Sequence, residues 1–167
     1  ILRSLNKPKD AASIAEKAKS LFSSNHLFDG LLGHINADIG NFEEAKQNYE
    51  NAIKKGPKDE ETLCWNLYTY ANFLVGIGIK KDGITYLKKV LDVNPKHAMS
   101  YYLLSDILRS EEDKVLENII LNFKISDFST VYDKYTILFS KSNIFHKRKD
   151  YEKSADLLKQ GNDLMLL

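Results

Sequence analysis

The chain has 167 residues and a formal net charge of +1, from 24 basic and 23 acidic side chains, so nothing in its charge favours a nucleic-acid partner or an anionic membrane surface. Hydrophobic residues make up 43% of the sequence and charged residues 28%, which is ordinary for a globular protein that buries a core. The single cysteine, Cys64, excludes an internal disulfide and a zinc site built on several thiolates. No apolar run approaches the roughly 18–20 residues that a membrane-spanning helix needs.

The segment 1–25 predicts half of a truncated helical repeat. Ala11, Ala15 and Ala18 recur at helical spacing, and we expect a helix over 10–23 in which these small residues lie against a neighbouring helix. The chain begins at Ile1 without an initiator methionine and ends on an apolar stretch, 164–167. Such ends favour a fragment of a longer protein or a processed chain.

Residues 26–59 predict two antiparallel helices. The first, over 26–39, has the apolar stripe Leu31, Leu32, Ile35 and Ile39. Gly40 is expected to end it, because glycine takes positive φ without strain. Asn41 then predicts the N-cap of a second helix, and Glu44 completes a capping box. The inner stripe of that second helix is Ala45, Tyr49, Ala52 and Ile53.

The same pattern returns at a constant offset over 60–97. When the two copies are aligned at this offset, small residues match small residues, glycine matches glycine and proline matches proline. The landmarks of the first copy are Leu32, Gly33, Gly40, Ala45, Tyr49, Ala52 and Pro57, and their counterparts are Tyr70, Ala71, Gly78, Gly83, Leu87, Val90 and Pro95. A helical hairpin cannot bury its apolar face alone, so repeated hairpins are expected to stack on one another.

The remainder predicts two degenerate hairpins, over 98–125 and 126–167. Helices are expected over 98–109, 111–123 and 128–146. The inward residues of the second would be Val115, Leu116, Ile119 and Ile120. The segment 150–155 repeats the start of the helix at Phe42, and no strand pattern occurs anywhere. The sequence therefore predicts an all-α fold.

The repeated unit resembles the tetratricopeptide repeat (TPR), a helix pair of about 34 residues. The resemblance rests on Leu32-Gly33, Gly40, Ala45, Tyr49, Ala52 and Pro57. Asp29 and Asn36 depart from it, because the family has large residues at these places. The resemblance implies a right-handed α-solenoid of about three to four units: a partial repeat over 1–25, TPR units over 26–59 and 60–97, and degenerate units over 98–125 and 126–167.

The first helix of each unit lines a concave groove in this family, and partners bind along that groove as peptides. The residues that the resemblance places there are His34, Asp38, Trp65, Tyr68, Asn72, Met99, Tyr102 and Asp106. Gly30, Ala37 and Val75 complete the set, and a regularly packed fourth unit would add Phe139 and Asn143. In the alternative interpretation, Trp65, Met99 and Tyr102 only close contacts between units.

Other candidate sites are weaker. His34 and Asp38 have a spacing that can ligate a metal, but no third ligand accompanies them, and we interpret them as an exposed polar pair. Cys64 is expected to be a buried small residue, and 76–78 a turn that ends a helix. With no catalytic motif present, we expect a protein that is not an enzyme and has no metal or cofactor.

The sequence thus favours a non-catalytic, cytoplasmic interaction module that binds a peptide or a partner protein, and neither nucleic acid nor membrane. The positions that hold basic residues in the TPR domains that clamp acidic chaperone tails are Gly30, Tyr68, Met99 and Leu103 here, so such a tail is not the expected ligand.

Two alternatives stay open. Residues 111–164 are similar to the region that joins TPR repeats to a sulfotransferase domain in certain bacterial proteins, through the motif at 150–162. This chain would then be the substrate-recruiting or oligomerising arm of a larger bacterial enzyme, sulfotransferase-like or glycosyltransferase-like, whose catalytic domain is absent. The apolar C-terminal helix over 151–167 could alternatively join two copies into a homodimer.

Overall fold

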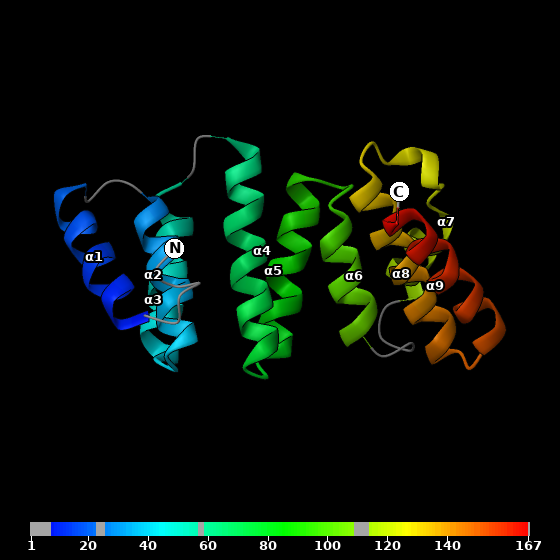
Figure 1. Ribbon diagram of the computed structural model, residues 1–167, viewed down its shortest axis with the longest axis horizontal. Helices are drawn as coiled ribbons and strands as arrows, with labels where there is room; N and C mark the ends of the chain where they lie inside the picture. Colours follow the sequence, from blue (N-terminus) through cyan, green and yellow to red (C-terminus); the bar gives the residue numbers. More distant parts are fainter. Residues whose placement is uncertain (1–7, 23–25, 57–58, 109–113, 167) are drawn as a thin grey trace. The chain divides into compact units, whose positions relative to one another are not determined.

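The computed structural model describes residues 8–22, 26–56, 59–108 and 114–166. Every regular element in these ranges is helical (Figure 1), so the all-α prediction is confirmed. The chain divides into two compact units, Ile1–Lys89 and Val90–Leu167, and helices within each unit are arranged in pairs.

The first unit contains α1 (Pro8–Leu21), α2 (His26–Asp38), α3 (Phe42–Lys54), α4 (Glu60–Gly76) and most of α5 (Lys80–Val93). Its neighbours in sequence are neighbours in space, because α2 packs against α1 and α3, and α3 packs against α4. The helix expected over 26–39 is found with almost the same bounds. The helix expected over 10–23 begins earlier, at Pro8, and Ser23 lies outside the described residues.

The turn between α2 and α3 confirms the expected role of Gly40 but not that of Asn41. Gly40 has φ +83°, a left-handed conformation that glycine adopts without strain. Asn41 is the N-cap residue of α3, but its side chain makes no capping hydrogen bond. Its amide nitrogen donates instead to Asn36 Oδ1, 3.4 Å away. The predicted capping box is therefore wrong, because the asparagine side chain turns back to α2.

Small residues let α2 and α3 approach closely. A Cβ added to Gly33 would lie 2.8 Å from the Tyr49 ring, closer than two carbon atoms can pack. Tyr49 and Ala45 join Tyr70 and Phe73 in one buried cluster with Leu74. Tyr70 also donates a hydrogen bond to Glu50 Oε1 at 2.6 Å, which links α4 to α3.

The second unit contains the end of α5, then α6 (Ala98–Ile107), α7 (Lys114–Asn122), the short 3₁₀ helix η1 (Ile125–Asp127), α8 (Val131–Lys147) and α9 (Tyr151–Met165). Helix α8 packs against α6, α7, η1 and α9. It therefore occupies the centre of this unit.

The two degenerate hairpins differ from the prediction in detail. Leu116 and Ile120 of α7 are buried as expected, but Val115 and Ile119 are exposed, because the neighbouring α8 covers one narrow face of this short helix. The helix expected from Phe128 begins at Val131, since Thr130 accepts a hydrogen bond from the Asp133 amide and caps it. Residues 109 and 111–113 of the expected helices lie outside the described residues.

The α8–α9 pair follows the plan of the α2–α3 pair, position by position. Ser142 and Ser154 replace Gly33 and Ala45 at the close approach, and their buried hydroxyl oxygens are 2.9 Å apart. Lys149 replaces Gly40 in the turn and adopts φ +61°, a strained conformation for a residue with a Cβ. The backbone thus keeps the turn although the glycine is lost.

Candidate functional site

Helix α4 carries an outward stripe of three predicted site residues. Trp65, Tyr68 and Asn72 are three and four positions apart, a spacing that places them on one face of a helix. Trp65 is 59% exposed, Asn72 is exposed and Tyr68 is half-buried, while most residues between them are buried. More than half of Trp65 is therefore accessible on this face of α4.

Helix α2 carries the matching stripe, and half of it was not predicted. Leu27 is 58% and Leu31 43% exposed, and they share a helix face with His34 and Asp38. The sequence repeat could have revealed Leu27, because it is the counterpart of Trp65. The repeat does not reveal Leu31, whose counterpart is the small, buried Thr69.

Helices α2 and α4 approach each other at Gly30. Asn66, which follows Trp65 in the chain, faces Gly30 of α2, where an added Cβ would lie 3.7 Å from Asn66 Oδ1. Gly30 lies between the exposed Leu27 and Leu31 on α2, and Asn66 is next to the exposed Trp65 on α4. We call the two stripes together the α2–α4 surface: Leu27, Leu31, His34, Asp38, Trp65, Tyr68 and Asn72.

His34 is less available than a free surface histidine. Its Nδ1 is 2.9 Å from the Tyr49 hydroxyl oxygen, and the two rings meet edge to face at 5.3 Å. The expected exposed polar pair is therefore half correct, since Asp38 is exposed but His34 is half-buried. The hydrogen bond fixes the imidazole orientation on the α2–α4 surface.

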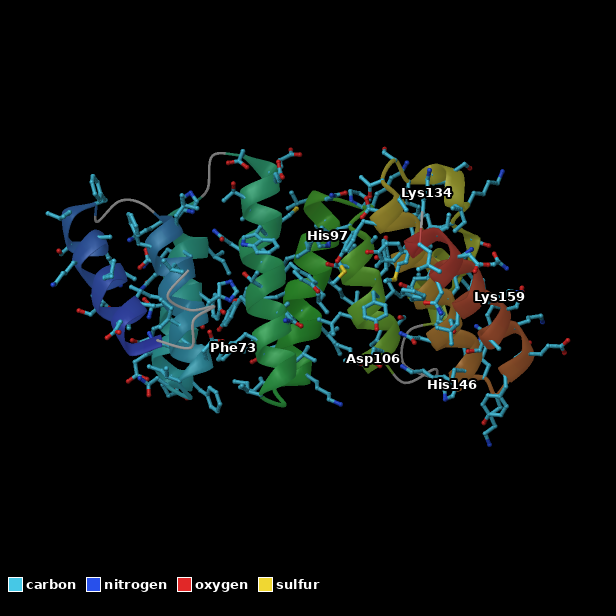
Figure 2. All side chains as sticks on the ribbon, in the orientation of Figure 1. Phe73, His97, Asp106, Lys134, His146 and Lys159 are labelled. Atoms are coloured by element: carbon cyan, nitrogen blue, oxygen red, sulfur yellow. The ribbon has the colours of Figure 1, made fainter. Side chains whose placement is uncertain are left out.

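In the second unit, the predicted residues Met99, Tyr102 and Asp106 lie on α6. Their spacing repeats that of Trp65, Tyr68 and Asn72 on α4. Tyr102 is 37% exposed, and Asp106 is exposed near the end of the helix, opposite His97 at its beginning (Figure 2). Met99 is half-buried, and its sulfur accepts a hydrogen bond from the Tyr132 hydroxyl of α8 at 2.9 Å.

Met99 thus contacts α8 as well as lying on the predicted stripe of α6. Tyr132 itself is 49% exposed and was not predicted as a site residue. Burial raises the pKa of the Tyr132 hydroxyl, so this group stays protonated and remains a hydrogen-bond donor at neutral pH.

The carboxyl end of α6 is held by α8. Lys147 Nζ donates to the backbone carbonyls of Ser105, Asp106 and Leu108, each at 2.6 Å, and a cation at this end complements the helix dipole. Asn143 donates to Ser105 Oγ at 3.1 Å. Asn143, which a regular fourth unit would present to a ligand, therefore helps to position α6.

Comparisons with known proteins agree on one kind of repeat. A family model described as "Tetratricopeptide repeat" matches residues 30–54. The chain is 28% identical over 100 residues to the TPR repeat-containing protein YpiA of Bacillus subtilis (strain 168), a match that covers 60% of this chain and 22% of YpiA. The chain thus spans about a fifth of the length of this curated relative.

Solved structures of similar fold include a TPR protein. YrrB, described as a TPR protein with an unusual peptide-binding site, superposes with a TM-score of 0.63 and 18% identity, over 98% of this chain and 80% of YrrB. MamA superposes with a TM-score of 0.65 and 14% identity, over 98% of this chain and 92% of MamA. Residues 30–54 match the tetratricopeptide repeat, and the chain as a whole is similar in fold to YrrB, a TPR protein. The fold of the chain is an α-solenoid of helix pairs.

The chain departs from the TPR pattern at Asp29. The carboxylate is fully buried, with Lys19 Nζ of α1 3.1 Å from Oδ1 and Lys55 Nζ, just after α3, paired with Oδ2. Both lysine side chains remain 29% exposed. An ion pair between three segments therefore fills the place where the TPR pattern has a large side chain.

Metal ions, membranes and thiol chemistry find little support in the described residues. Among the described residues, no three His, Cys, Asp or Glu side chains are grouped so that they could hold a metal ion. Within the same ranges, no helix is both long and apolar enough to cross a membrane. Cys64 is buried as expected, and burial raises the pKa of its thiol, which disfavours the reactive thiolate.

Proposed function

We propose that this protein binds an extended segment of a partner protein on the α2–α4 surface, with Trp65 as the main anchor. The exposure of Trp65 carries the proposal. Tryptophan is among the residues that most often dominate binding energy, and Trp65 is 59% exposed. Leu27 and Leu31 of α2 are exposed as well. Large apolar side chains exposed together are typical of an interaction site, which favours this role for the three residues.

The polar part of the α2–α4 surface supports a peptide rather than a small apolar ligand. Asn72 is exposed at one end of the α4 stripe, and its amide can both donate to and accept from a peptide backbone. His34, oriented by Tyr49, and the exposed Asp38 lie along α2. The apolar leucines would hold side chains while these groups hold the main chain.

The relatives support the same class of function. TPR solenoids are interaction scaffolds, and the similar structure YrrB is described as having a peptide-binding site.

We propose a mostly apolar or mixed peptide as the ligand, because Gly30 and Tyr68 occupy places where acidic-tail clamps have basic residues. The surface of α6, with Tyr102 and Asp106, is proposed as a second contact area. Homodimerisation through α9 stays a prediction.

The test is selection of peptides from a random library on the full chain, followed by affinity measurement for the best binder. Trp65→Ala is expected to weaken binding by about 2 kcal/mol, because it removes a hot-spot anchor. Tyr151→Ala is the matched control, since Tyr151 is an aromatic residue on α9 with a similar exposure of 58%. Circular dichroism of both variants verifies that the fold is intact.

A selected peptide that binds Trp65→Ala and the native chain equally would contradict the proposal. The aromatic stripe of α4 would then have a structural role only. Equal losses for Trp65→Ala and Tyr151→Ala would also contradict it, since binding would then lack a defined site.

A further inference from the structure

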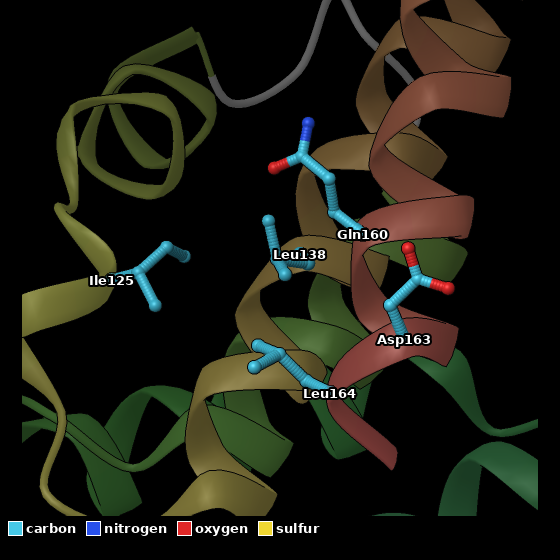
Figure 3. A pocket seen from close by; sticks show the side chains of 5 residues that line it. All are labelled: Ile125, Leu138, Gln160, Asp163 and Leu164. Carbon is cyan, nitrogen blue, oxygen red and sulfur yellow. The ribbon is translucent and has the colours of Figure 1, made fainter. Parts of the chain in front are cut away.

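A pocket of 440 Å³ lies in the second unit, and none of its lining residues belongs to the surfaces described above. It is lined by Ile125 of η1, Leu138 of α8, and Gln160, Asp163 and Leu164 of α9. Figure 3 shows Ile125 on one side of this space and the α9 residues on the other, with Leu138 between them. Its volume is within the range of sites that hold small ligands.

The walls of the pocket differ in chemistry from its rim. Ile125, Leu138 and Leu164 supply aliphatic carbon. Gln160 donates through Nε2 to Asp156 Oδ2 at 2.9 Å, so its remaining amide atom, Oε1, is an acceptor. Asp163 is exposed and adds a carboxylate. An aliphatic floor and an acceptor rim therefore belong to one cavity.

Among the described residues, no basic side chain is paired with the carboxylate at this rim. Asp163 forms no salt bridge with any residue in the described ranges, and none of the lining residues is basic. In the equivalent α2–α3 pair, the positions of Leu138 and Leu164 hold Asp29 and Lys55. In the α2–α3 pair these two positions form an ion pair. In the α8–α9 pair they are leucines that line the pocket.

We propose that this pocket binds an arginine or lysine side chain presented by a partner protein. Such side chains bury their methylene stem on apolar surface and keep the charged head in water. The stem would lie on Ile125, Leu138 and Leu164, and the head would pair with Asp163 and Gln160 Oε1. An acidic side chain would be repelled by Asp163, and a purely aliphatic one would leave the carboxylate unused.

The experiment is a titration of the full chain, labelled at its isoleucine and leucine methyl groups, followed by NMR. The probes are N-acetyl-arginine methylamide and its norleucine and glutamate equivalents. The arginine probe is expected to shift the methyl signals of Ile125, Leu138 and Leu164 at lower concentration than the norleucine probe. The glutamate probe is expected to leave them unchanged.

Variants separate charge recognition from apolar burial. Asp163→Asn is expected to weaken the arginine probe about threefold, the size of a partly exposed ion pair, and to leave the norleucine probe unaffected. Glu152→Gln is the matched control, because it removes one exposed carboxylate from α9 outside the pocket. Added salt is expected to weaken only the arginine probe.

Three results would overturn the proposal. Equal affinity for arginine and norleucine would show that the rim does not recognise charge. Shifts confined to residues outside the pocket would place binding elsewhere. Self-association of the native chain that Asp163→Asn abolishes would identify a second copy, and not a foreign partner, as the occupant. The pocket residues do not include Trp65, so the Trp65→Ala variant should bind the arginine probe as the native chain does. A negative result with this probe therefore says nothing against peptide binding on the α2–α4 surface.

Discussion

Asp29 shows how one residue can replace an apolar packing solution with an electrostatic one. A buried carboxylate is stable only when paired, and Lys19 and Lys55 supply the pairing from two other segments. The lysine heads keep contact with water, which lowers the desolvation cost of the pair. The corresponding leucines of the α8–α9 pair show that the same backbone arrangement accepts apolar residues.

This comparison predicts the stability of two variants. Lys55→Met is expected to lower the free energy of unfolding by about 2 kcal/mol, because it leaves the buried Asp29 with Lys19 alone. Asp29→Leu combined with Lys55→Leu, which copies Leu138 and Leu164, is expected to recover that loss or exceed the native stability. Urea unfolding measures both, and a double variant less stable than Lys55→Met would contradict the argument.

His97 predicts a pH dependence of stability. Its Nδ1 accepts from the Ser100 amide at 3.2 Å and so caps α6. Burial lowers the pKa of His97, although the Asp133 carboxylate opposes the shift. The unfolded chain binds a proton near pH 6.5, and the folded chain does so only at lower pH. Stability contributed by His97 is therefore present above about pH 6.5 and is lost as the pH falls toward the folded-state pKa.

His97→Asn isolates this contribution, since asparagine also caps helices but does not titrate. The variant is expected to lose less stability than the native chain between about pH 7.5 and pH 5.5. Urea unfolding at both pH values gives the comparison. The same loss in both proteins would assign the pH dependence to other groups.

At the scale of helices, close approach decides which residues a pair tolerates. Gly33 and Gly161 both lie where an added Cβ would meet an aromatic ring of the partner helix, Tyr49 in one case and Phe139 in the other. Gly30 is also within α2, but an added Cβ there makes only an ordinary contact. Two glycines of one helix are thus predicted to respond in opposite directions.

Gly33→Ala is expected to destabilise the protein by about 1–3 kcal/mol, because the tightly packed Tyr49 must move. Gly30→Ala is the matched control and is expected to stabilise it by about 0.8–1 kcal/mol, the gain in helix propensity. Thermal and urea unfolding give both signs. A stabilised Gly33→Ala variant would mean that α2 and α3 lie further apart than described.

At the scale of the whole molecule, repeat proteins are stabilised by contacts between neighbouring elements. The division of the chain into two compact units accords with this. Gly33→Ala is therefore expected to increase amide hydrogen exchange in α2 and α3 while leaving α8 and α9 as protected as in the native chain. Mass spectrometry of exchanged peptides measures this. A uniform loss of protection would show a single cooperative unit instead.

The sequence by itself determined the helices, the repeat and several turns, because these depend on local spacing and on glycine conformation. The internal repeat predicted the turn at Gly40 and the stripe of Trp65, Tyr68 and Asn72. Other inferences rest on short patterns and stay predictions. They are that the chain is a fragment, where the repeat units begin and end, and that the chain is the recruiting arm of a larger enzyme.

Only the tertiary structure decided which side chains remain exposed and which pair across helices. Local spacing cannot show that Trp65 faces solvent while Met99 contacts Tyr132, since both have the same place in their repeats. The partners of Asp29 come from segments on either side of α2, and the pocket at Leu138 depends on three elements meeting. These features are set by distances between helices, which no single helix encodes.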